Sequence, residues 1–173
     1  MPLRPGRAYR HFSGPAYTRK EFIKRTPGIR VILFDRGNPD RDFPVVMTLI
    51  ADEKGQIRHN ALEAARVAAN RVLESEAGRN NYHLKLRIYP HQILRENPMA
   101  VGAGADRISD GMRLAFGKPI GAAARVTSGQ KILTVRVPKE FVQLGKEALR
   151  RAAMKLPIKT RRIFEKGGEL IGS

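Results

Sequence analysis

The sequence contains no cysteine and no tryptophan, and aromatic residues make up only 6% of its 173 positions. Without cysteine there can be no disulfide scaffold, thiolate zinc site, iron–sulfur cluster or cysteine nucleophile, a composition typical of a reducing compartment. The four histidines (His11, His59, His83 and His91) show no metal-ligand spacing. The longest clearly apolar run, residues 45–51, is far shorter than the roughly 18 residues of a membrane span. We therefore expect no cofactor, no metal and no membrane association.

Acidic residues are also scarce, because 16 Asp and Glu stand against 33 Lys and Arg, which gives a formal charge of +17. A protein of this charge attracts polyanions. The hydrophobic fraction of 42% is sufficient for one core in a chain of this length. The composition thus predicts one strongly basic domain that binds an acidic partner.

The basic residues are concentrated at the two ends of the sequence. Residues 1–30 carry eight basic side chains and one acidic one, and residues 146–166 carry eight basic and two acidic ones. Because the first segment has little aliphatic material, we expect residues 1–28 to form an extended basic arm that orders on a partner. The residues expected to contact the polyanionic partner are Arg4, Arg7, Arg10, Tyr17, Arg19, Lys20, Lys24, Arg25, Lys85, Arg87, Arg150, Arg151, Lys155, Lys159, Arg161 and Arg162.

The aromatic residues of the arm leave two interpretations open. Tyr9, Phe12, Tyr17 and Phe22 alternate with basic residues, an arrangement that suits stacking on nucleobases. The same rings could instead pack the arm onto its own domain. Sequence alone favours neither.

Hydrophobic periodicity predicts two helices on a mixed, mostly antiparallel sheet, an α+β fold. The first helix is expected to begin at Asn60, whose spacing to Glu63 matches a capping box, and to end at Gly78. The second is expected over residues 140–156, before Pro157. Strands are expected at residues 29–35, 44–51, 82–89, 92–95, 122–127, 131–137 and 158–164, the fifth and sixth forming a hairpin through residues 128–129.

The run of residues 82–89 alternates between apolar and polar side chains. We expect Tyr82, Leu84, Leu86 and Ile88 to face the core. His83, Lys85, Arg87 and Tyr89 would then form a basic, solvent-facing side of the same strand. The domain is expected to span residues 29–166, with residues 167–173 as a C-terminal tail.

Residues 98–121 fit no regular element and contain five glycines. Loops of this length in compact domains are functional or disordered. This segment mixes glycines with hydrophobic and basic side chains, unlike a passive linker, so we expect it to dock into a partner. The candidate functional residues of this loop are Gly102, Gly104, Asp106, Arg107, Gly111, Met112, Arg113, Phe116 and Lys118.

Catalytic interpretations of the loop fail on spacing. The pair Gly102 and Gly104 begins a dinucleotide motif, but Arg107 stands where the third glycine belongs. A phosphate-binding loop ending at Lys118 has one residue too many between its glycines, and Pro119 replaces the required Ser or Thr. Asp106 and Asp110 are more simply explained as ion-pair partners of nearby arginines than as an acid/base pair.

Taken together, the segments resemble the universal large-subunit ribosomal protein sixteen family, in its archaeal and eukaryotic "ten-e" branch. The resemblance runs from about residue 4 to about residue 165. Its most diagnostic part is the loop Ala103-Gly-Ala-Asp-Arg-Ile-Ser-Asp-Gly-Met-Arg-Leu-Ala-Phe-Gly-Lys-Pro119. The other matching segments are residues 4–10, 15–20, 61–71, 83–91 and 124–126.

The resemblance implies a hammerhead-type α+β fold bound to large-subunit ribosomal RNA beneath the central protuberance. It also implies that the loop, here about residues 101–118, extends toward the peptidyl transferase centre and the tRNA in the aminoacyl site. The resemblance further implies that the protein lies on cytoplasmic ribosomes, contacts neighbouring ribosomal proteins and is not an enzyme. No intrinsic homo-oligomer is expected, because copies of this charge repel one another.

Two other functions are compatible with the charge. One is an RNA-modifying or nucleotide-dependent enzyme whose basic surface recruits RNA, with the loop as a lid; the failed motifs weigh against it. The other is a DNA-binding architectural protein, against which the lack of a clear helix-turn-helix pattern counts.

Overall fold

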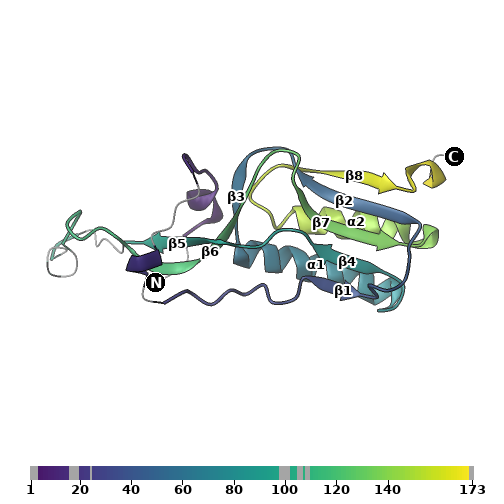
Figure 1. Ribbon diagram of the computed structural model, residues 1–173, viewed down its shortest axis with the longest axis horizontal. Coiled ribbons are helices and arrows are strands. Elements are labelled where there is room, and N and C mark those ends of the chain that lie inside the picture. Colours follow the sequence, from purple (N-terminus) through teal and green to yellow (C-terminus); the bar gives the residue numbers. More distant parts are fainter. Residues whose placement is uncertain are drawn as a thin grey trace.

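The computed structural model describes residues 4–15, 20–23, 25–97, 102–104, 107 and 110–171. Two α-helices pack on antiparallel sheets in this part of the chain, so the predicted α+β fold is confirmed (Figure 1). The described elements are η1 (Gly6–Tyr9), η2 (Lys20–Phe22), β1 (Asp35–Gly37), β2 (Val45–Ala51), β3 (Gly55–Arg58), α1 (His59–Ala77), β4 (His83–Leu86), β5 (Gln92–Glu96), β6 (Lys118–Val126), β7 (Lys131–Val137), η4 (Lys139–Phe141), α2 (Val142–Ala153), β8 (Thr160–Lys166) and η5 (Gly168–Ile171).

The strands form two sheets, where the sequence predicted one. The larger sheet has the order β1-β4-β7-β2-β8 and the smaller has the order β3-β6-β5, with every recorded pairing antiparallel. Figure 1 shows α1 and α2 covering one face of the larger sheet, while β5 and β6 extend away from this body and carry the loop at their far end. The fold therefore holds the loop away from the helices.

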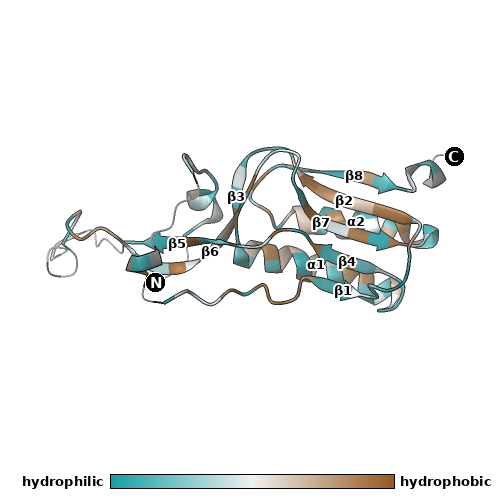
Figure 2. Cartoon of the chain, viewed as in Figure 1, coloured by the Kyte–Doolittle hydropathy of each residue, from teal (hydrophilic) through white to brown (hydrophobic). Residues whose placement is uncertain are grey.

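The core lies between the helices and the larger sheet. Strand β2 is almost entirely buried and largely hydrophobic (Figure 2), because it lies inside the sheet between β7 and β8. The prediction for residues 82–88 is confirmed, since Tyr82, Leu84, Leu86 and Ile88 are all buried. From α1 and α2, the side chains of Leu62, Leu73, Ala148 and Leu149 complete the core at 0% exposure.

The helix ends show where local signals succeed and fail. Gly78 ends α1 with a φ of 71°, a left-handed value that favours glycine, as predicted. The capping box at Asn60 is wrong: α1 begins one residue earlier, at His59, and no side chain caps its N-cap residue Arg58. Helix α2 is also shorter than predicted, because a 3-10 turn occupies residues 139–141 and the helix ends at Ala153.

Three strand predictions need correction. Residues 29–34 run along the sheet without entering it, and β1 covers only residues 35–37; Val31 is buried there, but Ile32 is 79% exposed. Strand β3 was missed because glycine and glutamine give it little β-propensity. The hairpin at residues 122–137 is wrong, since β6 and β7 belong to different sheets and the Ser128 hydroxyl instead donates to the carbonyl oxygen of Asp52 at 2.8 Å.

Truncation of Leu149 to alanine should destabilise the protein by about 2–5 kcal/mol, because it leaves a cavity between α2 and the sheet. Met154, 67% exposed just after the same helix, provides the control: Met154→Ala should change the free energy of unfolding by less than about 0.5 kcal/mol. Urea denaturation measures both. Similar losses for the two variants would contradict the assignment of the core.

Candidate nucleic-acid interface

The first described residues of the basic arm are attached to the smaller sheet. The backbone N–H of Gln56 donates to the carbonyl oxygen of Arg10 at 2.8 Å, and the Gln56 side chain donates to the carbonyl oxygen of Tyr9 at 3.0 Å. At the end of β5, the Glu96 carboxylate accepts from Arg4 Nε at 2.5 Å and from the Tyr9 hydroxyl at 3.0 Å. Burial raises the pKa of Tyr9, and the hydrogen bond to Glu96 raises it further. These bonds place the arm beside the base of the loop.

The described aromatic rings of the arm contact their own domain, which answers the question left open for Tyr9, Phe12 and Phe22. Arg58 lies over the Tyr9 ring at 5.6 Å, while Lys54 and Arg125 lie over the Phe12 ring at 4.7 and 4.5 Å. Such cation–π contacts fix the rings without removing the charges from the surface. Tyr17, Arg19, Lys24 and Asp106 lie outside the described residues, as does the side chain of Lys20.

Phe116 marks the base of the loop. Its ring meets Phe22 of the arm edge to face, with centroids 5.6 Å apart, and Arg95 of β5 lies over it at 3.8 Å. The next residue, Gly117, passes so close to β5 that a Cβ there would come within 2.7 Å of the Glu96 carbonyl carbon. Arm, loop and β5 thus meet at Phe116. Strand β6 begins two residues later, at Lys118, so its first residues lie inside the segment predicted as loop.

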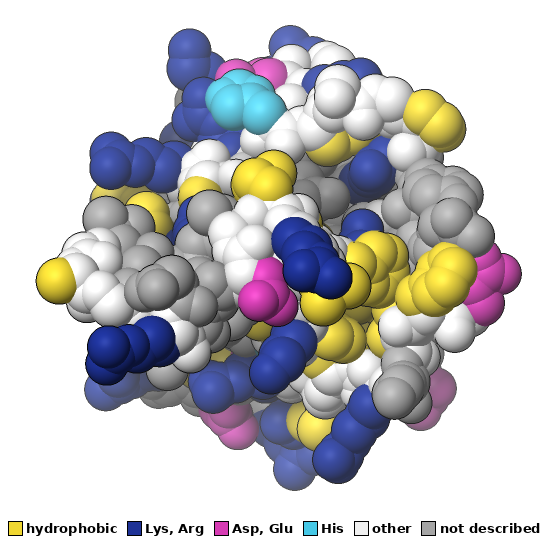
Figure 3. Space-filling view, turned by 90° about the vertical axis from the view of Figure 1, so that its left-hand side faces the viewer, with side chains coloured by type: hydrophobic (Ala, Val, Ile, Leu, Met, Phe, Trp, Pro, Cys, Tyr) yellow, Lys and Arg dark blue, Asp and Glu magenta, His cyan; other side chains and the backbone are white. Residues whose placement is uncertain are grey.

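The described loop residues that precede Phe116 do not pack against the core. Gly102, Gly104, Arg107, Met112 and Arg113 are all exposed, and Gly111 is half-buried. Of the two loop aspartates expected to form ion pairs, only Asp110 is described, and it forms none with the described residues. Its carbonyl oxygen instead accepts the backbone N–H of Arg113 at 3.2 Å. Figure 3 looks at this end of the molecule and shows hydrophobic side chains beside many Lys and Arg and few acids.

The C-terminal basic residues divide into paired and unpaired groups. Glu147 accepts hydrogen bonds from both Arg150 and Arg151 at 2.6–2.8 Å, and these bonds lower the pKa of Glu147 to about 2. Arg161 pairs with Asp52 at 3.0 Å, and Arg162 donates to the carbonyl oxygen of Lys146 at 3.3 Å. Within the described part of the chain, the exposed side chains of Lys155 and Lys159 have no such partner. Their ammonium groups are therefore available to phosphates.

Most of the remaining predicted residues also have structural contacts. Lys85 Nζ lies 3.3 Å from Asp35, Arg87 Nε donates to Thr134 Oγ1 at 3.2 Å, and Arg10 donates to the carbonyl oxygen of Pro157 at 3.4 Å. In the described structure Arg7 and Arg25 are exposed and form no ion pair. An arginine with one N–H engaged keeps further donors for a phosphate.

His83 corrects one prediction. It was expected to face solvent, but it is only 3% exposed, with Nε2 3.0 Å from Asp35 Oδ1. The reason is that edge strand β1 brings Asp35 over it, a pairing that alternation within one strand does not predict. His59, at the start of α1, is also buried, and its Nδ1 accepts the backbone N–H of Arg30 at 3.0 Å.

These two histidines predict a loss of stability in mild acid. Burial is the main cause that lowers the pKa of each below its ordinary 6.5, and for His83 the Asp35 hydrogen bond only partly opposes it. As the pH falls, the unfolded chain therefore takes up protons first, and the stability present above about pH 6.5 is lost toward the lower folded pKa.

Urea denaturation between pH 7.5 and 5.5 should show the unfolding free energy decreasing by up to about 1.4 kcal/mol per pH unit for each histidine. The double variant His59→Gln, His83→Gln should give a flatter profile. A wild-type stability that is constant over this range would contradict the buried, neutral state of both rings.

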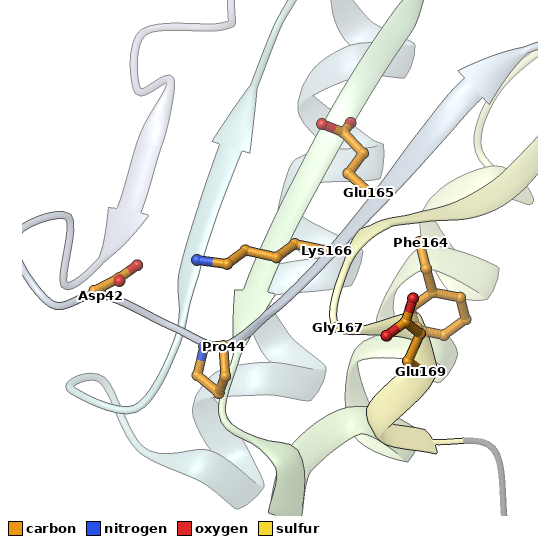
Figure 4. A pocket seen from close by; sticks show the side chains of 8 residues that line it. Asp42, Pro44, Phe164, Glu165, Lys166, Gly167 and Glu169 are labelled. Carbon is orange, nitrogen blue, oxygen red and sulfur yellow. The ribbon is translucent and has the colours of Figure 1, made fainter.

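A recess of about 730 Å³ between the ends of β2 and β8 shows no catalytic arrangement. In Figure 4 the Lys166 side chain extends toward Asp42, while Glu165 points away from it and Glu169 lies on the other side near Phe164. Glu165 is engaged by Lys131 at 2.7 Å. Among the described residues, no cluster of acids or histidines could hold a metal ion, and no helix is long and apolar enough to cross a membrane.

Several basic residues of this surface were missed by sequence reasoning. Lys54, Arg58 and Arg125 contact the arm, and Arg95 contacts the loop base. They are scattered singly over β3, β5, β6 and a turn, so no charge run marked them. Only the aromatic residues of the arm, which need partners, were a signal that such cations exist.

An α+β core with a basic arm, a basic C-terminal region and an exposed loop defines a protein of the polyanion-binding class. Comparison with known proteins is more specific. The family model described as "Ribosomal protein L16p/L10e" matches residues 12–163, so the chain belongs to this family. The predicted family is confirmed.

Full-length archaeal relatives agree. The chain is 59% identical to a large ribosomal subunit protein uL16 of Archaeoglobus fulgidus over 171 residues, covering 99% of the chain and 98% of the relative. It is 54% identical to that of Methanocella arvoryzae over 171 residues, 99% of both chains, and 58% identical to that of Staphylothermus marinus over 165 residues, 95% of both. Membership in a family of ribosomal proteins disfavours the enzyme alternative.

Proposed function

We propose that this protein is a structural constituent of the large ribosomal subunit, where it binds ribosomal RNA and neighbouring ribosomal proteins. The observation that carries the proposal is its similarity along almost the whole chain to proteins named for that subunit. The charge of +17 on an otherwise ordinary core supports it, because such a surface needs a polyanion to neutralise it.

The basic arm and the C-terminal basic region supply most of the RNA contacts in this proposal. Among the described residues predicted to bind RNA, Arg7, Arg25, Lys155 and Lys159 are exposed and form no ion pair, so they bind phosphates directly. The paired arginines Arg150 and Arg151 contribute less, since Glu147 offsets one of their two charges and engages part of their donors. Residues 1–28, 29–166 and 167–173 act as arm, platform and tail.

The loop positions tRNA in the aminoacyl site near the peptidyl transferase centre. Two observations support this role of the loop. Phe22, Arg95 and Phe116 hold the loop at its base, and the described loop residues before Phe116 are mostly exposed. A segment that is fixed at its base and whose described residues are mostly exposed can reach a second partner.

Salt dependence tests the RNA-binding part. If about ten cations engage phosphates, the logarithm of the binding constant should fall with the logarithm of salt concentration with a slope of roughly 7–9. Filter binding of the protein to large-subunit RNA over about 50–300 mM KCl measures this slope. An affinity insensitive to salt would overturn the proposal.

A further inference from the structure

Strand β8 is an exposed edge of the larger sheet. It spans seven residues, Thr160–Lys166, and in the described structure it pairs only with β2, so its other side has no partner strand. Five of its seven side chains are exposed, and Figure 1 shows the strand along the border of the sheet. Such an edge offers a row of backbone N–H and C=O groups with which a strand of another chain can pair.

A groove of about 280 Å³ lies between this edge strand and α2. Four apolar and two basic residues line it: Met47, Lys146, Leu149, Arg162, Ile163 and Phe164. Met47 and Leu149 belong to the core, at 1% and 0% exposure, whereas Phe164 is 40% exposed. The strand register sets Phe164 opposite Met47, so both lie on the side of the sheet that faces the helices. The groove is therefore an apolar recess beside a free strand edge.

The two basic residues of the groove have no counter-ion. Arg162 Nη1 donates to the carbonyl oxygen of Lys146 at 3.3 Å, and Lys146 Nζ lies 5.6 Å from the centroid of the Phe164 ring. Within the described part of the chain neither cation forms an ion pair, whereas the neighbouring Arg161 pairs with Asp52. Two positive charges beside an apolar recess favour a ligand that carries carboxylates next to an aliphatic group.

RNA matches these charges but neither the recess nor the strand edge. The donors and acceptors of a nucleobase would lack partners among the apolar side chains of the groove, and burying unpaired polar groups is costly. The edge of β8 presents backbone groups at the spacing of a strand, which another polypeptide matches and a phosphate backbone does not. An extended acidic peptide satisfies the edge, the recess and the cations together.

We propose that β8 and the groove beside it dock an extended acidic segment of a neighbouring protein. The segment adds a strand to the free edge of β8, inserts one aliphatic side chain between β8 and α2, and pairs its carboxylates with Lys146 and Arg162. The inference rests on the proposed function, which includes neighbouring proteins as partners, and it places one of them at this edge. Arg162 then contacts protein rather than RNA.

The test uses the full-length protein with ¹³C-labelled methionine methyl groups and the capped peptide Thr-Glu-Thr-Leu-Thr-Glu-Thr, whose leucine and glutamates share one face of a strand. Binding should shift the NMR signal of Met47, which lines the groove, and leave that of Met112 in the loop unchanged. Two control peptides should bind at least about tenfold more weakly. One is N-methylated at every residue and cannot donate to a strand edge, and the other has the same composition without the alternation.

Charge reversal tests the role of the two cations. Lys146→Glu with Arg162→Glu should weaken binding of the acidic peptide at least about tenfold, and should bind instead a peptide in which lysine replaces both glutamates. The matched control is Arg71→Glu with Arg79→Glu, which changes the net charge equally at exposed arginines of α1 and of the turn after it. This control should bind the acidic peptide as wild type does. Circular dichroism shows whether each variant is folded.

Two results would overturn the inference. One is that the control peptides bind as tightly as the alternating peptide or that Met47 does not respond, because the binding is then only general charge attraction. The other is that Lys146→Glu with Arg162→Glu weakens binding to large-subunit RNA more than the matched control does, because the surface is then an RNA site. Binding of wild type to that RNA, measured by filter binding, tests the proposed function separately, since no peptide enters the measurement.

Discussion

Replacing residues 100–113 with a three-residue glycine–serine linker is expected to leave folding and RNA binding intact while slowing peptide-bond formation at least about tenfold. The structure explains the separation. Apart from the half-buried Gly111, the described residues of this segment are exposed, and all lie outside both sheets, so their removal costs little core burial. Residues 116–118 remain, and with them the contacts of Phe116 and the start of β6.

The short linker is feasible because β5 and β6 are paired next to the loop, with Glu96 opposite Lys118. Ribosomes reconstituted with each variant allow single-turnover measurement of peptide-bond formation and of tRNA binding to the aminoacyl site. A second variant, Arg107→Gln with Arg113→Gln, keeps the loop and removes two charges, so it separates the effect of shape from that of charge. Normal translation by subunits shown to contain the shortened loop would refute the role of the loop.

Neutralising unpaired cations should weaken RNA binding far more than neutralising paired ones. The triple variant Arg7→Gln, Lys155→Gln, Lys159→Gln is expected to lose roughly 10–100-fold in affinity near 150 mM salt, with a salt slope lower by about 2–3. These three side chains are exposed and form no ion pair within the described structure, so each can release counterions from a phosphate.

The matched variant is Arg150→Gln with Arg151→Gln, which removes two charges from the same C-terminal region. Both arginines already hydrogen-bond Glu147 and lower its pKa to about 2, and their removal leaves that carboxylate as an unpaired negative charge at neutral pH. Its loss of affinity per charge should come mainly from long-range electrostatics, and its salt slope should change by less than about 1. Equal losses per charge in the two variants would show that internal pairing does not decide which cations bind RNA.

Much of the architecture could be predicted because it depends on local patterns. Alternation predicted which side of residues 82–88 is buried, and the glycine at position 78 predicted the end of α1. The pairing of Glu147 with Arg150 and Arg151 also follows from helical spacing of three and four residues, although charge counting alone did not use it. Local spacing thus contains more about the site than the net charge does.

The rest depends on contacts between segments far apart in the sequence. His83 is buried because edge strand β1 supplies Asp35, and the 122–137 hairpin fails because each strand finds partners in another sheet. Likewise, Phe116 meets Phe22 and Arg95 only once arm and loop are folded side by side. No pattern within a window of ten or twenty residues contains that information.

Co-sedimentation with ribosomal subunits tests the central claim most directly. On a sucrose gradient at low salt, the tagged full-length protein should travel with the large subunit, remain absent from the small-subunit fractions, and dissociate only at high salt. Protein that remains at the top of the gradient at low salt, or that follows the small subunit, would contradict the account.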